Sequence, residues 1–369
     1  MLMVCGRGNL APTLTKSALM SRMNQLKQQQ PKLLIIGKGG KKEGMGHLVR
    51  ISALVETLAP NYLVTVLVKQ DRFGEFFFKQ KGIDCFTYQD NRGLYLFLGK
   101  TTRTGKYAVV IIDIYRISIN VIKRIENYCD FLVNFDDMQR RLQYPINGVF
   151  LCPQEPFNWE IESRGATVVA KGTDFFPLRQ IFAQYREQHR FKKNVNNMGI
   201  ILGGVPSKTY TLQLIRLLDH FLDKTVNLHA VMGFDPGEIH NQAFSSRVHI
   251  EKNVDNMAAF ITEMDVGIIA GGFIKFEFMC IGTPFLLVSL CHHQQKLARK
   301  FASKGYGAYL GEIKHLIANP GKFRRKIESF LSNDILRVEM FENSRRLVDG
   351  QGSSRILEMV NTLTGHTPP

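Results

Sequence analysis

Long apolar runs are absent from this chain of 369 residues. The most apolar segments, residues 109–112 and 285–290, have the length of strands. A membrane-spanning helix needs roughly 18 such residues, so we expect no transmembrane segment. The first residues also lack the apolar core of a secretory signal, which makes a signal peptide improbable. A transit peptide or a misplaced start codon stays open.

Cysteine and tryptophan are scarce, with six and one residues respectively. The cysteines form no C-x-x-C pair and no zinc-type spacing apart from a loose run, Cys291 to His293. We therefore expect reduced thiols and no disulfides, which indicates a cytoplasmic protein. No known RNA- or DNA-binding module is present, so we expect no nucleic-acid partner.

Acidic residues are missing from the first 42 positions, which hold eight Lys and Arg. They contribute half of the formal net charge of +16. We interpret residues 1–30 as a basic tail, partly helical or disordered. The smaller surplus in the rest of the chain is compatible with a patch that attracts phosphates, or with peripheral contact to an anionic membrane surface.

Short β-branched runs alternate with amphipathic segments from residue 32 onward, which predicts an α/β fold with parallel sheets. We expect two doubly wound domains, 31–190 and 191–369, separated by the polar stretch 185–197. The predicted strands are 33–36, 63–68, 85–88, 108–112, 131–134, 148–151, 198–202, 228–232, 248–251, 266–269 and 285–288. The predicted helices are 47–58, 72–81, 119–128, 208–222, 256–262, 273–281 and 294–304, with an all-helical end from 312 to 363.

A glycine-rich loop, G-K-G-G-K-K-E-G-M-G-H-L-V-R, occupies residues 37–50 between the first strand and the first helix. Its glycines permit close backbone approach to a ligand. A helix that starts near Gly46 directs free N–H groups toward an anion and favours a neutral His47, able to accept a proton. The loop matches neither the Walker pattern nor the dinucleotide fingerprint. The alternative is that His47 only caps or packs.

A second strand, glycine pair and helix follow at I-I-A-G-G-F-I-K-F-E, residues 268–277. Gly271 and Gly272 allow a diphosphate to approach the helix, and Glu277 is placed to accept hydrogen bonds from ribose hydroxyls. A tight turn with a surface Glu is the alternative. The pair Gly203 and Gly204 ends the first strand of the same domain in a similar way.

Several motifs occur in a fixed order along the chain. They are G-M-G-H-L-V-R, D-x-Y at 113–115, F-D-D at 135–137, G-T-D-F-F-P-L-R at 172–179, L-G-G, N-M-A-A-F-I-T-E-M-D at 256–265, A-G-G…E, I-G-T-P and H-Q-Q-K-L-A at 293–298. Over about residues 33–311 this series resembles the UDP-sugar hydrolases of pseudaminic acid biosynthesis and their spore-coat polysaccharide relatives. The second half is also similar to the lipid II-forming N-acetylglucosaminyltransferases.

The resemblance implies a GT-B architecture, in which two Rossmann-like domains face a central cleft. It implies a UDP-sugar as substrate, no cofactor and no metal. Catalytic positions carried over are His47, Asp113 and Tyr115. Nucleotide-sugar-binding positions carried over or expected from the loops are Gly44, Gly46, Arg50, Gly203, Gly204, Gly271, Gly272, Lys275, Glu277, His293 and Gln294. Asp136 and Asp137 match motif positions near the cleft, where Asp also commonly caps or forms turns.

Three departures from the family pattern bear on activity. Gly37 to Gly39 stand where the hydrolases usually have Arg-x-Asp, Phe273 to Lys275 replace small hydroxyl residues, and His293 replaces Asn. The leading prediction is a nucleotide-sugar hydrolase in which His47 activates water. The alternatives are a GT-B glycosyltransferase that uses His47 as base on an acceptor hydroxyl, and a binding protein that has lost its chemistry.

Overall fold

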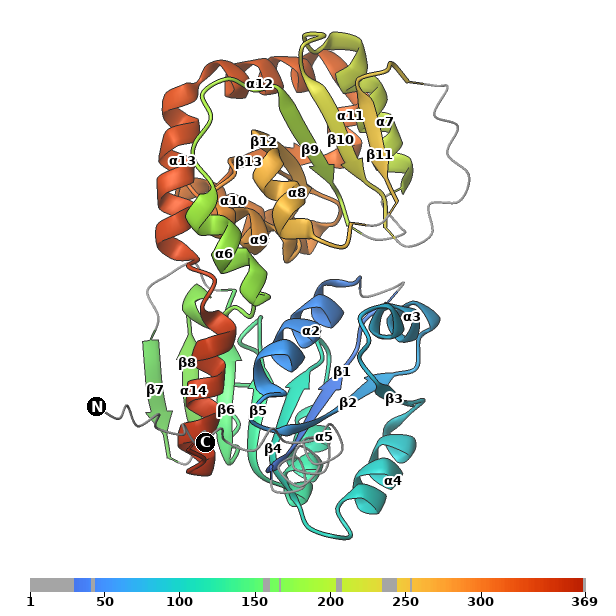
Figure 1. The fold of residues 1–369 in the computed structure, drawn as a ribbon, viewed down its shortest axis with the longest axis vertical. Helices are drawn as coiled ribbons and strands as arrows, with labels where there is room; N and C mark the ends of the chain where they lie inside the picture. The colour runs from blue at the N-terminus through green and yellow to red at the C-terminus, as the bar shows by residue number, and fades with distance from the viewer. Residues whose placement is uncertain are drawn as a thin grey trace, which may run out of the picture.

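The computed structural model describes residues 30–40, 44–154, 160–165, 167–203, 208–233, 244–252 and 254–367. Two α/β lobes lie one above the other, and the chain crosses between them at α6 and again between α13 and α14 (Figure 1). The predicted basic tail lies outside the described residues, except for Gln30. Within the described part of the chain, no helix has the length and apolar character needed to cross a bilayer.

The amino-terminal domain is built on an eight-stranded sheet of order β3-β2-β1-β4-β5-β6-β8-β7. Every pairing in it is parallel except that of β7 with β8. Its elements are β1 (Lys32–Gly37), α2 (Gly46–Leu58), β2 (Leu63–Lys69), α3 (Arg72–Gln80), β3 (Cys85–Tyr88), α4 (Asn91–Thr101), β4 (Tyr107–Asp113), α5 (Ile119–Ile125), η1 (Glu126–Tyr128), β5 (Cys129–Phe135), β6 (Gly148–Cys152), β7 (Glu160–Arg164), β8 (Thr167–Lys171) and η2 (Thr173–Phe175).

Both faces of this sheet are covered, as the uninterrupted apolar strands require. In β1, Leu33 and Ile35 contribute to the core beneath α2, whereas Leu34 and Ile36 contribute to the core on the opposite face. Helix α2 buries Leu48, Ile51, Leu54 and Leu58 along one stripe. The spacing of three and four residues in this stripe explains why a helix, with its first turn at His47, docks in this orientation.

The carboxyl-terminal domain has a six-stranded parallel sheet of order β11-β10-β9-β12-β13-β14. Its elements are α6 (Gln180–Gln188), β9 (Asn197–Ile201), α7 (Lys208–Phe221), β10 (Asn227–Val231), β11 (Val248–Glu251), α8 (Met257–Glu263), β12 (Val266–Ala270), α9 (Ile274–Ile281), β13 (Phe285–Ser289), α10 (His292–Ser303), β14 (Ala308–Glu312), α11 (Ile313–Ala318), α12 (Pro320–Ser332) and α13 (Asp334–Leu347). The last helix of the chain is α14 (Gly352–Thr364).

All eleven predicted strands are present within one or two residues of their expected ends, and the predicted helices and the helical carboxyl end are present as well. Five α-helices and β-strands were not predicted. Helices α4 and α6 and strand β14 were left as connections, and the antiparallel pair β7 and β8 was missed. Strand β7 consists of the sequence Glu160–Arg164, which is too polar and short to predict a strand.

Two helices cross the boundary that we expected near residue 190. Helix α6 packs against α8 and α9 of the carboxyl-terminal domain. Helix α14 returns to the amino-terminal domain, where Ile356 and Val360 join the core beneath α2. The lobes are therefore joined by two chain crossings, which limits the motions available to them.

The strand orders place the expected loops at corresponding points of the two sheets. In each sheet the strand order changes direction next to the first strand, between β1 and β4 in one sheet and between β9 and β12 in the other. The loops that follow these two neighbouring strands therefore lead to opposite faces of the sheet. Ligands of doubly wound sheets bind in the crevice that such loops form. The loop that contains His47, the end of β4 at Asp113 and the glycine pair after β12 all lie at these points.

Candidate functional site

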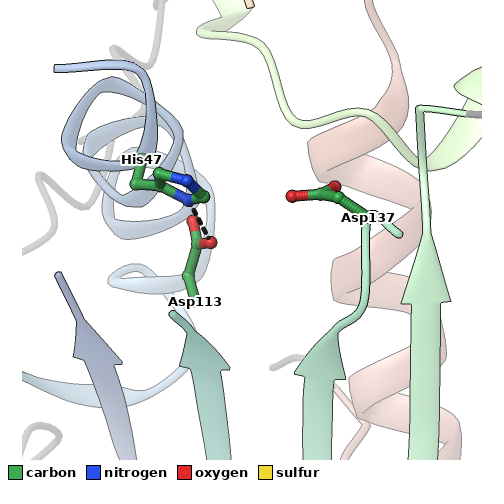
Figure 2. Close-up of side chains that lie close together, drawn as sticks. All are labelled: His47, Asp113 and Asp137. Atoms are coloured by element: carbon green, nitrogen blue, oxygen red, sulfur yellow. Dashed lines mark hydrogen bonds and ion pairs between the residues drawn. The ribbon is translucent and has the colours of Figure 1, made fainter. Parts of the chain in front are cut away.

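His47 and Asp113 form a buried hydrogen-bonded pair at the carboxyl end of the amino-terminal sheet. The His47 Nδ1 atom lies 2.7 Å from Asp113 Oδ1 (Figure 2). Asp113 is the last residue of β4 and is fully buried, and His47 lies in the first turn of α2. An ionised carboxylate accepts hydrogen bonds, so it selects the tautomer in which Nδ1 carries the proton. Nε2 then keeps a lone pair that can accept a proton.

Arg50 joins this pair to a second carboxylate. Its Nε donates to Asp113 Oδ2 at 2.8 Å, and its terminal nitrogens donate to Asp137 Oδ1 and Oδ2 at 2.9 and 3.0 Å. Asp137 follows β5, the strand next to β4, so the guanidinium bridges two adjacent strand ends. Arg50 lies one helical turn after His47, which brings both side chains to the same face of α2.

Charge compensation keeps this buried cluster ionised. Burial opposes the charge on Asp113, but Arg50 and His47 outweigh that effect and hold the pKa of Asp113 well below its usual range. Burial likewise opposes the charge on Arg50, and Asp113 and Asp137 raise the pKa of its guanidinium above the ordinary value. Nitrogen and oxygen atoms of His47, Asp113 and Asp137 all lie within 4.8 Å of one another, as metal ligands would. Here the cation that both carboxylates contact is Arg50.

Phe273 of the carboxyl-terminal domain lies directly on this cluster. Its ring meets the His47 imidazole edge to face, with centroids 5.1 Å apart, and lies 4.5 Å from the Arg50 guanidinium. A Cβ atom on Gly46 would lie only 2.8 Å from the Phe273 ring, so glycine is needed here for the domains to approach. The candidate site is therefore formed where the two domains touch.

Two helix N-termini meet at this contact. Helix α2 begins after Met45 and α9 begins after Phe273, and neither cap residue makes a side-chain hydrogen bond to the first turn. Their first N–H groups lack the usual side-chain partner, and both helix dipoles have their positive ends here. Gly44, with a φ of +83°, turns the chain into α2 through a conformation that glycine adopts readily.

Glu277 and Lys275 are both buried in the first turns of α9. Glu277 lines a small pocket together with Gly46, Arg50, Phe176 and Phe273, so residues of both domains contribute to it. Burial raises the pKa of Glu277 to about 7, with Arg179 opposing. The Lys275 ammonium donates to the Gly272 carbonyl at 3.0 Å, and burial lowers its pKa to about 7.

The other predicted site residues lie around this centre at different depths. Tyr115 is partly exposed two residues beyond Asp113, where Arg116 and Arg140 flank its ring. Gln294 packs beside Gly271, and its side-chain oxygen accepts a hydrogen bond from the Leu290 backbone. Asp136 is paired with Arg141 at 2.9 Å, a structural contact rather than one to His47.

Gly203 lies two residues beyond the end of β9 and has a φ of +94°. Gly204 and the side chain of His293 lie outside the described residues. Three aromatic rings lie around the Arg50 guanidinium carbon, with centres 4.1, 6.0 and 4.5 Å from it: Phe135, Phe176 and Phe273. They were not predicted as functional, because they look like core residues in the sequence. The available signal was Phe273 itself, a large apolar residue in a glycine loop where small hydroxyl residues are expected.

A scan against family models finds no match. The chain is 27% identical over 345 residues to the spore coat polysaccharide biosynthesis protein SpsG of Bacillus subtilis, covering 89% of this chain and 97% of SpsG. The solved structure of Acinetobacter baumannii MurG superposes with a TM-score of 0.60 at 14% identity, covering 90% of this chain and all of that one.

A Staphylococcus aureus MnaA–UDP co-structure superposes with a TM-score of 0.55 at 12% identity, over 91% of this chain and 98% of that one. Solved structures named as glycosyltransferases align equally well. The identities are too low to transfer an activity, but the superpositions span both domains. The chain has the GT-B fold, with two Rossmann-like domains whose loops face one another.

Proposed function

We propose that the protein binds a nucleoside-diphosphate sugar between its domains and transfers the sugar to an acceptor hydroxyl. The observation that carries the proposal is the Asp113-oriented His47 imidazole facing the glycine loop of the other domain, at 5.1 Å from Phe273. The similarity to SpsG, which is named for polysaccharide biosynthesis, supports the same assignment.

In this reaction His47 Nε2 acts as general base. It takes the proton from the acceptor hydroxyl while that oxygen attacks the anomeric carbon of the sugar, and the bond from that carbon to the diphosphate breaks. The bonding electrons move to the departing diphosphate oxygen. Asp113 holds the imidazole in the required tautomer and stabilises the imidazolium that forms, as buried acids do in comparable dyads.

The uncapped N-termini of α2 and α9 stabilise the leaving group electrostatically. Free backbone N–H groups at the positive end of a helix dipole stabilise the charge that develops on a departing diphosphate. Gly272, where an added Cβ atom would meet nothing within 4 Å, leaves room for phosphate oxygens beside α9, and Glu277 lies further along the same helix for ribose hydroxyls. The MnaA structure with UDP has the same fold, which supports a nucleotide in this cleft.

Hydrolysis is the second candidate, because the motif series of the chain resembles sugar-nucleotide hydrolases. The same dyad would then act on water. In both cases the residues favour chemistry without a metal, since Arg50 already neutralises the two carboxylates that could bind one. We also propose a cytoplasmic location, where sugar nucleotides are made.

Release of nucleoside diphosphate from a panel of UDP- and dTDP-sugars, measured with and without acceptors and with EDTA, tests this proposal. We expect release that rises strongly with a suitable acceptor and is insensitive to EDTA. Release at the same rate without acceptor would assign hydrolysis instead. Binding of nucleotide without any turnover would contradict both assignments.

A further inference from the structure

The loops after β4 and β5 bring a second group of side chains to the edge of the candidate site. Tyr115 and Arg116 lie two and three residues beyond Asp113, and Arg140 lies three residues beyond Asp137. The Arg116 and Arg140 guanidinium carbons lie 5.9 and 5.4 Å from the centre of the Tyr115 ring. We call these three residues the arginine platform. It adjoins the His47 dyad through the two strand ends that Arg50 bridges.

A buried arginine holds the two loops of the platform together. Arg141 pairs with Asp136 at 2.9 Å, and its other terminal nitrogen donates to the Ile117 carbonyl at 3.3 Å. The Arg141 backbone N–H also donates to Asp136 Oδ2 at 2.7 Å. The loop after β4 is thereby fixed to the loop after β5, so the platform is a preorganised surface rather than two independent flexible loops.

Two features of the platform indicate a ligand. Arg116 and Arg140 are exposed, and within the described part of the chain neither makes an ion pair with a carboxylate. Both guanidinium groups approach the same Tyr115 ring, and an anion bound beside that ring supplies the counter-charge that both lack. Gln139, next to Arg140, has a φ of +52°, a conformation rare for residues other than glycine and concentrated at functional sites.

We propose that the arginine platform binds a phosphate group carried by the acceptor. This inference rests on the proposed function and names the chemical class of its second substrate. Guanidinium groups recognise phosphate through paired N–H donors, and both arginines approach the same aromatic ring, that of Tyr115. A phosphate held there places the remainder of the acceptor toward His47, because both loops lead directly back to Asp113 and Asp137.

Binding is tested first with inorganic phosphate on the full chain, using the arginine Nε–Hε resonances in proton–nitrogen correlation spectra. Arg116→Gln and Arg140→Gln assign the two resonances. Arg124 is the matched control, since it is exposed and lies 3.9 Å over Tyr95 but sits at the end of α5, remote from the site. We expect saturable shifts for Arg116 and Arg140 only. No shift, or an equal shift of Arg124, overturns the inference.

A second measurement separates the two sources of phosphate. Co-sedimentation with phosphatidylcholine vesicles containing phosphatidic acid is compared between wild type and the Arg116→Gln/Arg140→Gln variant, which keeps the same basic tail. Loss of vesicle binding in the variant assigns a lipid-borne phosphate. If phosphate shifts the two arginine resonances but vesicle binding is absent or unchanged, the phosphate belongs to a soluble acceptor.

Kinetics separate this inference from the proposed function. With a phosphate-bearing acceptor that supports turnover, the double variant should raise the acceptor KM by about tenfold or more with a smaller change in kcat, whereas Arg124→Gln should leave both unchanged. An unchanged acceptor KM overturns the inference. If wild type turns over no sugar nucleotide, the proposed function fails, while the phosphate shifts still decide whether the platform is an anion site.

Discussion

The His47 imidazole and the Phe273 ring meet edge to face across the domain boundary, with centroids 5.1 Å apart and planes inclined at 68°. Each comes from the first turn, or the cap, of a helix whose N-terminus points into the contact. Phe273 therefore covers the proposed base in this conformation. A sugar can reach His47 only after the Phe273 side chain moves or the domains separate.

Phe273→Ala should expose His47 to reagents. His47 is 8% exposed, so diethyl pyrocarbonate should modify it slowly in wild type and at least several-fold faster in the variant. Mass spectrometry of peptides gives the rate, with the 79% exposed side chain of His315 as internal reference. Phe86→Ala, at a 57% exposed position away from the site, should not change it. Equal rates of His47 modification in all three proteins would show that Phe273 does not shield His47 from solvent.

Arg50→Gln should be strongly destabilising, because it leaves Asp113 and Asp137 buried without their cation. Removal of one partner from a buried ion pair costs about 3–5 kcal/mol, and urea unfolding should show a loss of this size. The matched control is Arg346→Ala, which breaks an exposed pair with Glu342 and should cost about 0.5 kcal/mol or less. A loss below about 1 kcal/mol for Arg50→Gln would contradict the ionic cluster described here.

Glu277 should make stability depend on pH between about 4.5 and 7. Its pKa is raised from 4.5 to about 7 by burial, so the stability that the protonated group provides is complete below pH 4.5 and is lost as the pH rises through 7. Glu277→Gln removes this dependence. The variant should gain about 3 kcal/mol relative to wild type from pH 4.5 to pH 8, measured by urea unfolding. A difference that is constant with pH would argue against a buried, protonated Glu277.

Asp113→Asn tests the orienting role of the carboxylate. The variant should lower kcat by about 10²–10⁴-fold, since His47 loses its preferred tautomer, while nucleotide affinity changes little. Asp265→Asn is the control. Asp265 is also buried, and accepts hydrogen bonds from the Asn196 and Asn197 backbones remote from the site, so its replacement should reduce stability but keep kcat. Equal kcat values in both variants would remove Asp113 from the mechanism.

Much of the fold could be predicted because its signals are local. Apolar strands such as Val266–Ala270 end in glycines, and amphipathic helices such as α7 carry their period in consecutive residues. The return of α14 to the amino-terminal domain was not predictable, because an apolar stripe does not say which sheet it will cover. The unpredicted strands β7, β8 and β14 have five residues each, and only pairing with a neighbouring strand makes such short segments regular.

The site residues within one glycine-rich loop could be predicted from the sequence. The contacts between residues far apart in the sequence could not. His47 and Gly46 stand out through the glycines around them. Arg50 could be placed near the site, but its two partners could not be predicted. Asp113 and Asp137 follow it by 63 and 87 residues in the sequence. The position of Phe273 against His47 depends on how the two domains meet, which no local pattern encodes.

The decisive measurement is single-turnover cleavage of a bound sugar nucleotide, with acceptor present, by wild type and by His47→Ala. The expected result is that cleavage slows by about 10²–10⁴-fold in His47→Ala, while the dissociation constant of the nucleoside diphosphate stays within a few-fold of wild type. Cleavage by His47→Ala at the wild-type rate would contradict it.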